Sequence, residues 1–200
     1  MNFFRIFIIY CLTLGLFAGT SFAVPSTGDA AKTASEIESR LENCAEKTLE
    51  VEFLCDPEWK SGKKGNTVFA VISADPAVTL TIHRRASPVV SLLQWDHQQL
   101  KDLGKYADGF RTEQVAFAGE EALKVKAFSE EYPQIRLLDY YLIHDGDLYS
   151  ILFSVEPKEN WDDYKFLLQK IAHSFNFIDT IRFLKLNPRE ESFPPRYSEE

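Results

Sequence analysis

Apolar and polar residues alternate with a period of two along much of the chain, a pattern that predicts β-strands joined by short turns. Asp75-Pro76 and Asp145-Gly146 stand between alternating segments, and the Asp-Gly pair favours a type I′ hairpin turn. In residues 66–73 both faces are apolar, so this strand needs cover on its two sides. The predicted strands cover residues 49–55, 66–73, 78–85, 110–117, 121–128, 134–143 and 148–155.

Three segments carry apolar residues at helical spacing. The first is predicted to begin at Thr33, which forms a capping box with Glu36, and to carry its apolar stripe on to Cys44. The second begins at Ser87-Pro88 and ends near residue 107. The third spans about 159–174, and its predicted buried stripe comprises Trp161, Tyr164, Leu168, Ile171 and Phe175.

The order of these elements predicts the fold class. A helix, three strands, a second helix, four strands and a final helix follow one another, and short turns between strands favour antiparallel pairing. Strands that are apolar on both faces require helices on both sides of the sheet. The sequence therefore predicts an α+β fold, a three-layer α/β/α sandwich with a mainly antiparallel sheet.

The N-terminal segment predicts export. Arg5 precedes an unbroken apolar run over residues 6–19, and Ser21 and Ala23 are the small residues of a signal-peptidase site. We therefore expect residues 1–23 to be a cleaved signal peptide and the mature protein to be periplasmic or secreted. The alternative is a membrane anchor, for which the run is shorter than the roughly 20 residues that a spanning helix needs. No stable membrane insertion is expected after cleavage.

The charge of the chain limits its partners. Of 22 basic and 30 acidic residues only Arg5 lies in the signal segment, so the remaining chain carries a net charge of −9. This acidic balance argues against nucleic acid and anionic lipid as partners.

Two cysteines remain after the signal segment, Cys44 and Cys55, in a compartment that permits disulfides. If Cys44 ends a helix and Cys55 ends the strand after it, their Cα atoms lie farther apart than the roughly 7 Å a disulfide spans. A disulfide and a pair of buried free thiols both remain open.

No arrangement of residues indicates catalysis. The histidines, His83, His97, His144 and His173, have no second ligand at metal-binding spacing, and no phosphate-binding or nucleophile motif occurs in the sequence. We therefore expect no enzyme, no metal and no cofactor.

Several short motifs resemble the PsbP-like family of exported domains, which includes PsbP- and DcrB-type proteins. They are Trp59 after Pro57, Gly119 and Ala122 in AGEEA, Gly146, Tyr149 and Phe153 in DGDLYSILF, and Ser174-Phe175. The resemblance covers 49–178. We therefore expect residues 24–48 to form an N-terminal extension with a helix, and 179–200 to form a C-terminal extension that is disordered from about 187. The turn Cys55-Asp56-Pro57-Glu58-Trp59 departs from the family's usual Tyr-Pro-x-Gly-Trp.

The resemblance implies a non-enzymatic accessory or protein-binding domain of the cell envelope with an unknown protein partner. A sheet edge or the face near Trp59 is the predicted contact surface. The alternative is a carrier that holds a small apolar ligand between sheet and helix, among Phe69, Tyr141 and Trp161. These three aromatic residues also fit ordinary core positions.

Overall fold

The computed structural model describes residues 27–87, 92, 100 and 105–178, and the predicted signal peptide and C-terminal tail lie outside this part. The described helices are α2 (Thr27–Ser39), the 3₁₀ helix η3 (Lys158–Asn160) and α4 (Trp161–His173). The strands are β1 (Glu42–Glu46), β2 (Val51–Cys55), β3 (Lys60–Lys64), β4 (Thr67–Ala74), β5 (Ala77–Ala86), β6 (Arg111–Phe117), β7 (Glu120–Phe128), β8 (Arg136–His144), β9 (Asp147–Glu156) and β10 (Asn176–Phe177).

Seven strands form one sheet in the order β3-β4-β5-β9-β8-β7-β6, and each described neighbouring pair is antiparallel. Each of the strands predicted in residues 66–155 lies in this sheet. The hairpin at Asp145-Gly146 joins β8 to β9, and positive φ values of 49° and 82° at its two residues agree with the predicted type I′ turn. The mainly antiparallel α+β class is therefore confirmed.

A second, smaller sheet was not predicted. It has the order β1-β2-β10, so the strand after α4 returns to pair with a strand near the start of the domain. The predicted domain boundary at residue 49 falls inside the β1–β2 hairpin. Residues 42–48 are therefore part of the folded unit.

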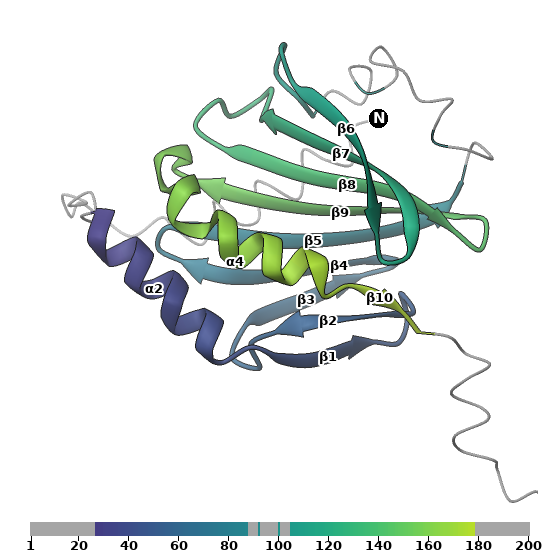
Figure 1. Cartoon of the computed structure of the whole chain (residues 1–200), viewed down its shortest axis with the longest axis horizontal. Helices are drawn as coiled ribbons and strands as arrows, with labels where there is room; N and C mark the ends of the chain where they lie inside the picture. The colour runs from purple at the N-terminus through teal and green to yellow at the C-terminus, as the bar shows by residue number, and fades with distance from the viewer. Residues whose placement is uncertain (1–26, 88–91, 93–99, 101–104, 179–200) are drawn as a thin grey trace, which may run out of the picture.

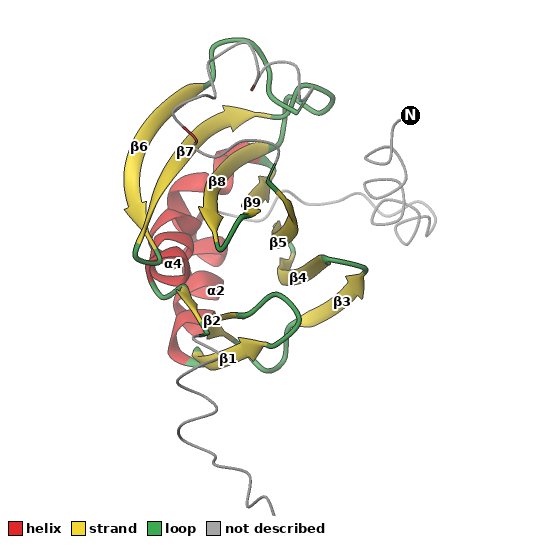
Figure 2. Ribbon diagram, turned by 90° about the vertical axis from the view of Figure 1, so that its right-hand side faces the viewer, coloured by secondary structure: helices red, strands yellow, loops and turns green. Residues whose placement is uncertain are grey.

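The α-helices α2 and α4 lie on the same side of the seven-stranded sheet (Figures 1 and 2). Helix α4 crosses this side, and α2 packs beside it near the small sheet. The helix predicted over residues 87–107, which would form the third layer, lies mostly outside the described residues. Of that segment, Leu100 is buried, and it packs in an apolar cluster on the opposite face of the sheet.

Two apolar clusters occupy the two faces of the large sheet. The cluster on the α4 side joins α2, α4, β2 and alternate residues of the sheet, among them Leu80, Leu138 and Phe153. The cluster on the opposite face contains the intervening residues, such as Leu123, Val125 and Leu137. This alternation is the period of two seen in the sequence. It explains why most of the strands were predicted at their observed positions.

The predicted first helix was wrong at both ends. Helix α2 begins at Thr27, and Thr33 lies in its interior, where its hydroxyl donates to the carbonyl of Asp29 at 2.9 Å instead of capping a terminus. The helix ends at Ser39, and Cys44 lies in β1. The buried stripe is Ala30, Ala34 and Ile37.

The position of Cys44 in a strand changes the cysteine geometry. In the β1–β2 hairpin Glu42 is opposite Cys55 and Cys44 is opposite Phe53, so the two cysteines are diagonal neighbours on one face. Their Cα atoms are 5.8 Å apart and the structure joins their sulfur atoms in a disulfide. The predicted separation of more than roughly 7 Å was wrong because the helix ends at Ser39 and does not extend to Cys44.

The hairpin geometry predicts that Cys44 and Cys55 are unreactive toward maleimide in the denatured, unreduced full chain and reactive after reduction. Mass spectrometry of the labelled peptides measures this. Because the bridge closes a short loop, replacing both cysteines with alanine is expected to lower the free energy of unfolding by about 2–3 kcal/mol. Labelling of both cysteines before reduction would contradict the bridge.

Candidate functional site

Trp59, the predicted centre of a partner-binding face, is half-buried and packs against the α4-side core. Its backbone amide donates to the carbonyl of Asp56 at 2.9 Å, which tightens the turn before β3. Its indole N–H is buried and has no acceptor among the described residues. Trp59 is therefore mainly a packing residue of this turn.

The three aromatic residues of the predicted carrier pocket do not come together. Tyr141 is buried in the cluster on the face opposite α4, whereas Trp161 lies at the start of α4 and packs against the α4-side core. Phe69 lies on β4 and its ring covers Gly62 on the edge strand β3. The sheet separates Tyr141 from Trp161, so these residues line no common cavity. Trp161 is half-buried, not fully buried as predicted.

A buried polar network surrounds Asp139 on β8, whose side chain is fully buried. Tyr106 donates to one carboxylate oxygen at 2.7 Å, Ser150 donates to the other at 3.0 Å, and the Lys105 ammonium lies 3.5 Å from the first. The hydroxyl groups of Tyr106 and Tyr141 are 2.6 Å apart, and Lys105 donates to Tyr141 at 3.0 Å. The carboxylate therefore has partners on both oxygens.

The pKa values of Lys105, Tyr106 and Tyr141 in this network all lie above their usual range. Burial by itself lowers the pKa of Lys105, but Asp139 and Tyr141 together outweigh burial and hold that pKa above its usual range. Burial and then Asp139 raise the pKa of Tyr141 to about 12 and that of Tyr106 well above 10. Near neutral pH the tyrosines are therefore neutral donors and Lys105 is a cation.

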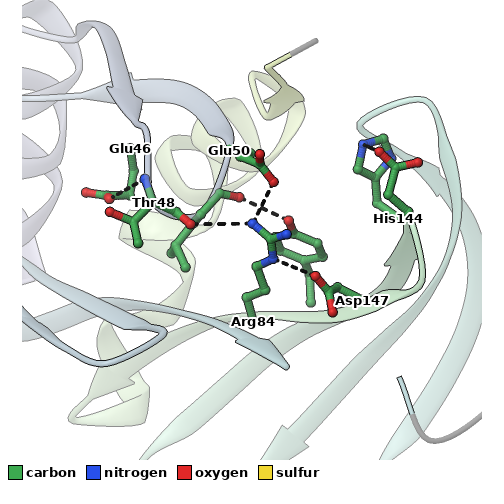
Figure 3. A network of polar contacts seen from close by, with 9 residues as sticks. Glu46, Thr48, Glu50, Arg84, His144 and Asp147 are labelled. Carbon is green, nitrogen blue, oxygen red and sulfur yellow. Dashed lines mark hydrogen bonds and ion pairs between the residues drawn. The ribbon is translucent and has the colours of Figure 1, made fainter. Parts of the chain in front are cut away.

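A second network lies where β5, β8 and β9 approach the β1–β2 hairpin (Figure 3). Arg84 binds Asp147 at 2.7 Å and Glu50 at 2.6 Å, and its guanidinium lies over the ring of Tyr149. The Tyr149 hydroxyl donates to the carbonyl of Leu49 at 3.1 Å. These contacts tie the small sheet to the large one. Because they satisfy one another, the network has the character of a structural clamp.

His144 extends this region beside the small sheet. Its ring stacks on Phe177 of β10 with 3.6 Å between centroids, and its Nδ1 is 2.7 Å from a Glu120 carboxylate oxygen. Phe177 meets the ring of Tyr149 edge to face. The histidine therefore helps to hold β10 against the large sheet.

The opposite end of the sheet carries a different cluster, which we call the Phe128 cluster: Phe128, Arg136, Lys158 and Trp161. Arg136 lies between two rings, 4.8 Å from the Trp161 centroid and 5.7 Å from the Phe128 centroid. The Lys158 ammonium lies 5.4 Å from the Phe128 centroid. Phe128 and Arg136 are paired across β7 and β8, and Lys158 and Trp161 belong to η3 and the start of α4.

The Phe128 cluster differs from the two networks in what it leaves exposed. Phe128 is 42% exposed, one of the two large exposed apolar residues in the described part of the chain. Neither Arg136 nor Lys158 forms an ion pair with any described residue, whereas Arg84 and Lys105 do. The cluster thus presents an aromatic ring and two cations that have no carboxylate partner in the described structure.

One feature of the sequence indicates this cluster. Alternation in β7 places Lys124, Lys126 and Phe128 on the same face. Because Lys124 and Lys126 are charged, the face of β7 that they share is not expected to be fully buried. Phe128 at the end of this face is therefore expected to be exposed. The networks around Arg84 and Asp139 could not be predicted in this way, since their members come from distant segments.

The remaining features of the described part do not indicate a reaction. No group of three or more metal-ligating side chains occurs there. No described helix is long and apolar enough to cross a membrane. A shallow depression of about 400 Å³ lies at the β6–β7 turn and is lined by Gln114, Val115, Ala116, Gly119, Glu120 and Glu121.

No protein-family model matches the chain. No curated protein matches it in sequence either. Among solved structures, the cyanobacterial PsbP of Synechocystis sp. PCC 6803 is 14% identical, covers 82% of this chain and 99% of its own, and has a TM-score of 0.47. LpqN of Mycobacterium tuberculosis, described as involved in cell envelope biogenesis, is 8% identical over 63% of this chain and 82% of its own, with a TM-score of 0.43.

PA94 of Pseudomonas aeruginosa, a protein of unknown function, is 11% identical over 80% of this chain and 99% of its own, with a TM-score of 0.41. The PsbP-like proteins named from the sequence motifs thus occur among the matching structures. At these identities and scores no residue and no activity is transferred to this chain.

The Asp139 network predicts a large effect of removing its cation. Lys105→Met leaves a buried carboxylate with hydroxyl donors only, and we expect the free energy of unfolding to fall by about 3 kcal/mol. Denaturant unfolding followed by circular dichroism measures this. Lys165→Met, which removes an exposed ion pair with Asp162, is the matched control and is expected to change stability by about 0.5 kcal/mol or less. Equal effects of the two variants would contradict the role assigned to Lys105.

Proposed function

We propose that the protein is an exported, non-catalytic accessory domain that binds another protein of the cell envelope through the Phe128 cluster. The observation that carries this proposal is the exposed Phe128 ring beside Arg136, which stacks on Trp161. Aromatic residues, above all tryptophan and tyrosine, and arginine contribute much of the binding energy at protein interfaces. The N-terminal signal pattern supports export.

The buried chemistry of the chain favours binding over catalysis. Asp139 has the donors and neighbours of a catalytic carboxylate, but its side chain is fully buried and both its oxygens are engaged by the protein. Arg84 is likewise held by two carboxylates. Arg136 and Lys158 of the Phe128 cluster, by contrast, form no ion pair with any described residue, and the Phe128 ring beside them is exposed.

The geometry of the cluster also suits a preformed contact surface. Phe128 and Arg136 are held by strand pairing, and the backbone amide of Lys158 donates to the carbonyl of Gln134 at 2.8 Å. Trp161 is fixed at the start of α4, the helix that packs in the core. Side chains that are ordered before binding lose less entropy when a partner arrives.

The proposal predicts where a partner can be crosslinked. A photoreactive benzoylphenylalanine replaces Gln134, an exposed residue beside the cluster, or Lys47 in the β1–β2 turn as a control at the other end of the sheet. In cells that make the protein, we expect position 134 to give a discrete crosslinked product and position 47 to give none.

Phe128→Ala in the position-134 background is expected to abolish this product while the unfolding curve stays cooperative. Phe166→Ala removes the other exposed ring and serves as the matched control, with the product retained. A product formed from position 47, or one that survives Phe128→Ala, would overturn the proposed surface.

A further inference from the structure

The Phe128 cluster continues into a row of cations on the same side of the large sheet. Arg111 on β6 is paired with Lys126 on β7, and Lys126 precedes Phe128 by two residues on the same face. Lys124, two residues before Lys126, lies over the ring of Tyr140, and Tyr140 belongs to the α4-side core. The "cationic face" therefore comprises Arg111, Lys124, Lys126, Arg136 and Lys158.

Carboxylates do not balance these cations. Glu113 on β6 lies 3.8 Å from Lys124 and 4.0 Å from Lys126, and it is the only described carboxylate that forms an ion pair with a member of the face. Glu120, at the far end of β7, is paired with His144. Five cations thus share one carboxylate among the described contacts.

Other acids lie near the face in sequence: Glu130 and Glu131 after β7, Glu156 at the end of β9, Glu159 beside Lys158 in η3, and Asp162 and Asp163 in the first turn of α4. Glu131 accepts a hydrogen bond from Tyr132 at 3.1 Å, and Glu156 accepts one from Gln134 at 3.1 Å. Glu156 lies on β9 beside Val155, a residue of the α4-side core, so alternation directs it to the opposite face. None of these carboxylates forms an ion pair with Arg136 or Lys158 in the described structure.

This group of cations contrasts with the chain as a whole, which carries a net charge of −8. Such a separation of charge orients a partner before contact and selects one of opposite sign. Arg136 adds a planar fork that matches a carboxylate with two parallel hydrogen bonds. The Phe128 and Trp161 rings contact this fork, and its N–H groups have no carboxylate partner in the described structure.

We propose that the partner presents an acidic protein segment that docks on the cationic face, with its carboxylates against Arg136, Lys126 and Lys158 and an apolar side chain against Phe128. This inference rests on the proposed function and names the chemistry of the partner. The exposed ring favours protein over a polyanion alone, because it offers apolar area that phosphate or a lipid headgroup does not use.

An oligoglutamate peptide carrying a fluorescent label is the probe, and fluorescence anisotropy with the full chain measures binding. We expect binding that weakens about tenfold between about 50 mM and about 200 mM salt, because exposed charges are screened. An oligoglutamine peptide of the same length is expected not to bind.

Charge reversal then locates the site. The double variant Lys126→Glu with Arg136→Glu is expected to weaken oligoglutamate binding at least about tenfold, since it replaces two attractions by repulsions. The matched control reverses two exposed cations elsewhere, Lys32→Glu with Lys47→Glu, and has the same net charge. It is expected to change affinity by about twofold or less. Equal losses in the two variants would show that net charge, not this face, governs binding and would overturn the inference.

Two other probes distinguish the alternatives. Anionic phospholipid vesicles or a single-stranded oligonucleotide that bind the chain more tightly than oligoglutamate would overturn the acidic-protein proposal in favour of that class of partner. Loss of oligoglutamate binding with an intact, Phe128-dependent crosslink would refute the acidic chemistry and leave the proposed function standing. Oligoglutamate binding without any crosslink from position 134 would refute the proposed function and leave the affinity of the cationic face for carboxylates standing.

Discussion

The burial of one helix against two sheets determines the rest of the described structure. Tyr164, Leu168 and Ile171 of α4 are fully buried, and Phe175 after the helix stacks on Phe53 of the small sheet at 4.7 Å. Phe175 also meets Phe117 of the large sheet, with 5.6 Å between ring centroids. Fully burying one such side chain contributes roughly 1.5–3 kcal/mol. Because α4 is fixed at this end, its first residue, Trp161, is held beside β7 and β8, where it stacks on Arg136.

The two ends of the large sheet then have different roles. At one end Arg84 links Glu50 of the β1–β2 hairpin to Asp147 of β9, so opposite charges hold the two sheets together. At the other end Arg136 lies between two aromatic rings and has no described carboxylate. A guanidinium that two carboxylates engage has little capacity left for a partner, whereas one supported by rings keeps its donors. The same residue type therefore stabilises the fold at one end and is available for binding at the other.

The parts of the fold that follow from local pattern could be predicted from the sequence. Alternation located β4 to β9, and Asp145-Gly146 located their last hairpin. The predicted helix start at Thr33 was wrong, because a capping-box sequence looks the same inside a helix as at its start. Strand β3 was missed, because Lys60–Lys64 has the composition of a loop. Contacts between distant segments could not be predicted from the sequence. The residues around Asp139 do not indicate that Tyr106 contacts it, and those around Arg136 do not indicate a contact with Trp161. The predicted grouping of Tyr141 with Trp161 was wrong for the same reason, since alternation within one strand does not show on which side of the sheet a distant helix packs.

Amide hydrogen exchange of the full chain, free and in complex with its crosslinked partner, tests the assignment of the binding surface most directly. Bound and free chains are compared peptide by peptide under conditions in which the fold remains native. We expect the complex to show slower exchange in the segment from Lys126 to Leu137 and in the first turn of α4, with no change in the β1–β2 hairpin or near Trp59. Protection confined to the hairpin and the Trp59 turn, with unchanged exchange around Phe128, would contradict binding at the Phe128 cluster.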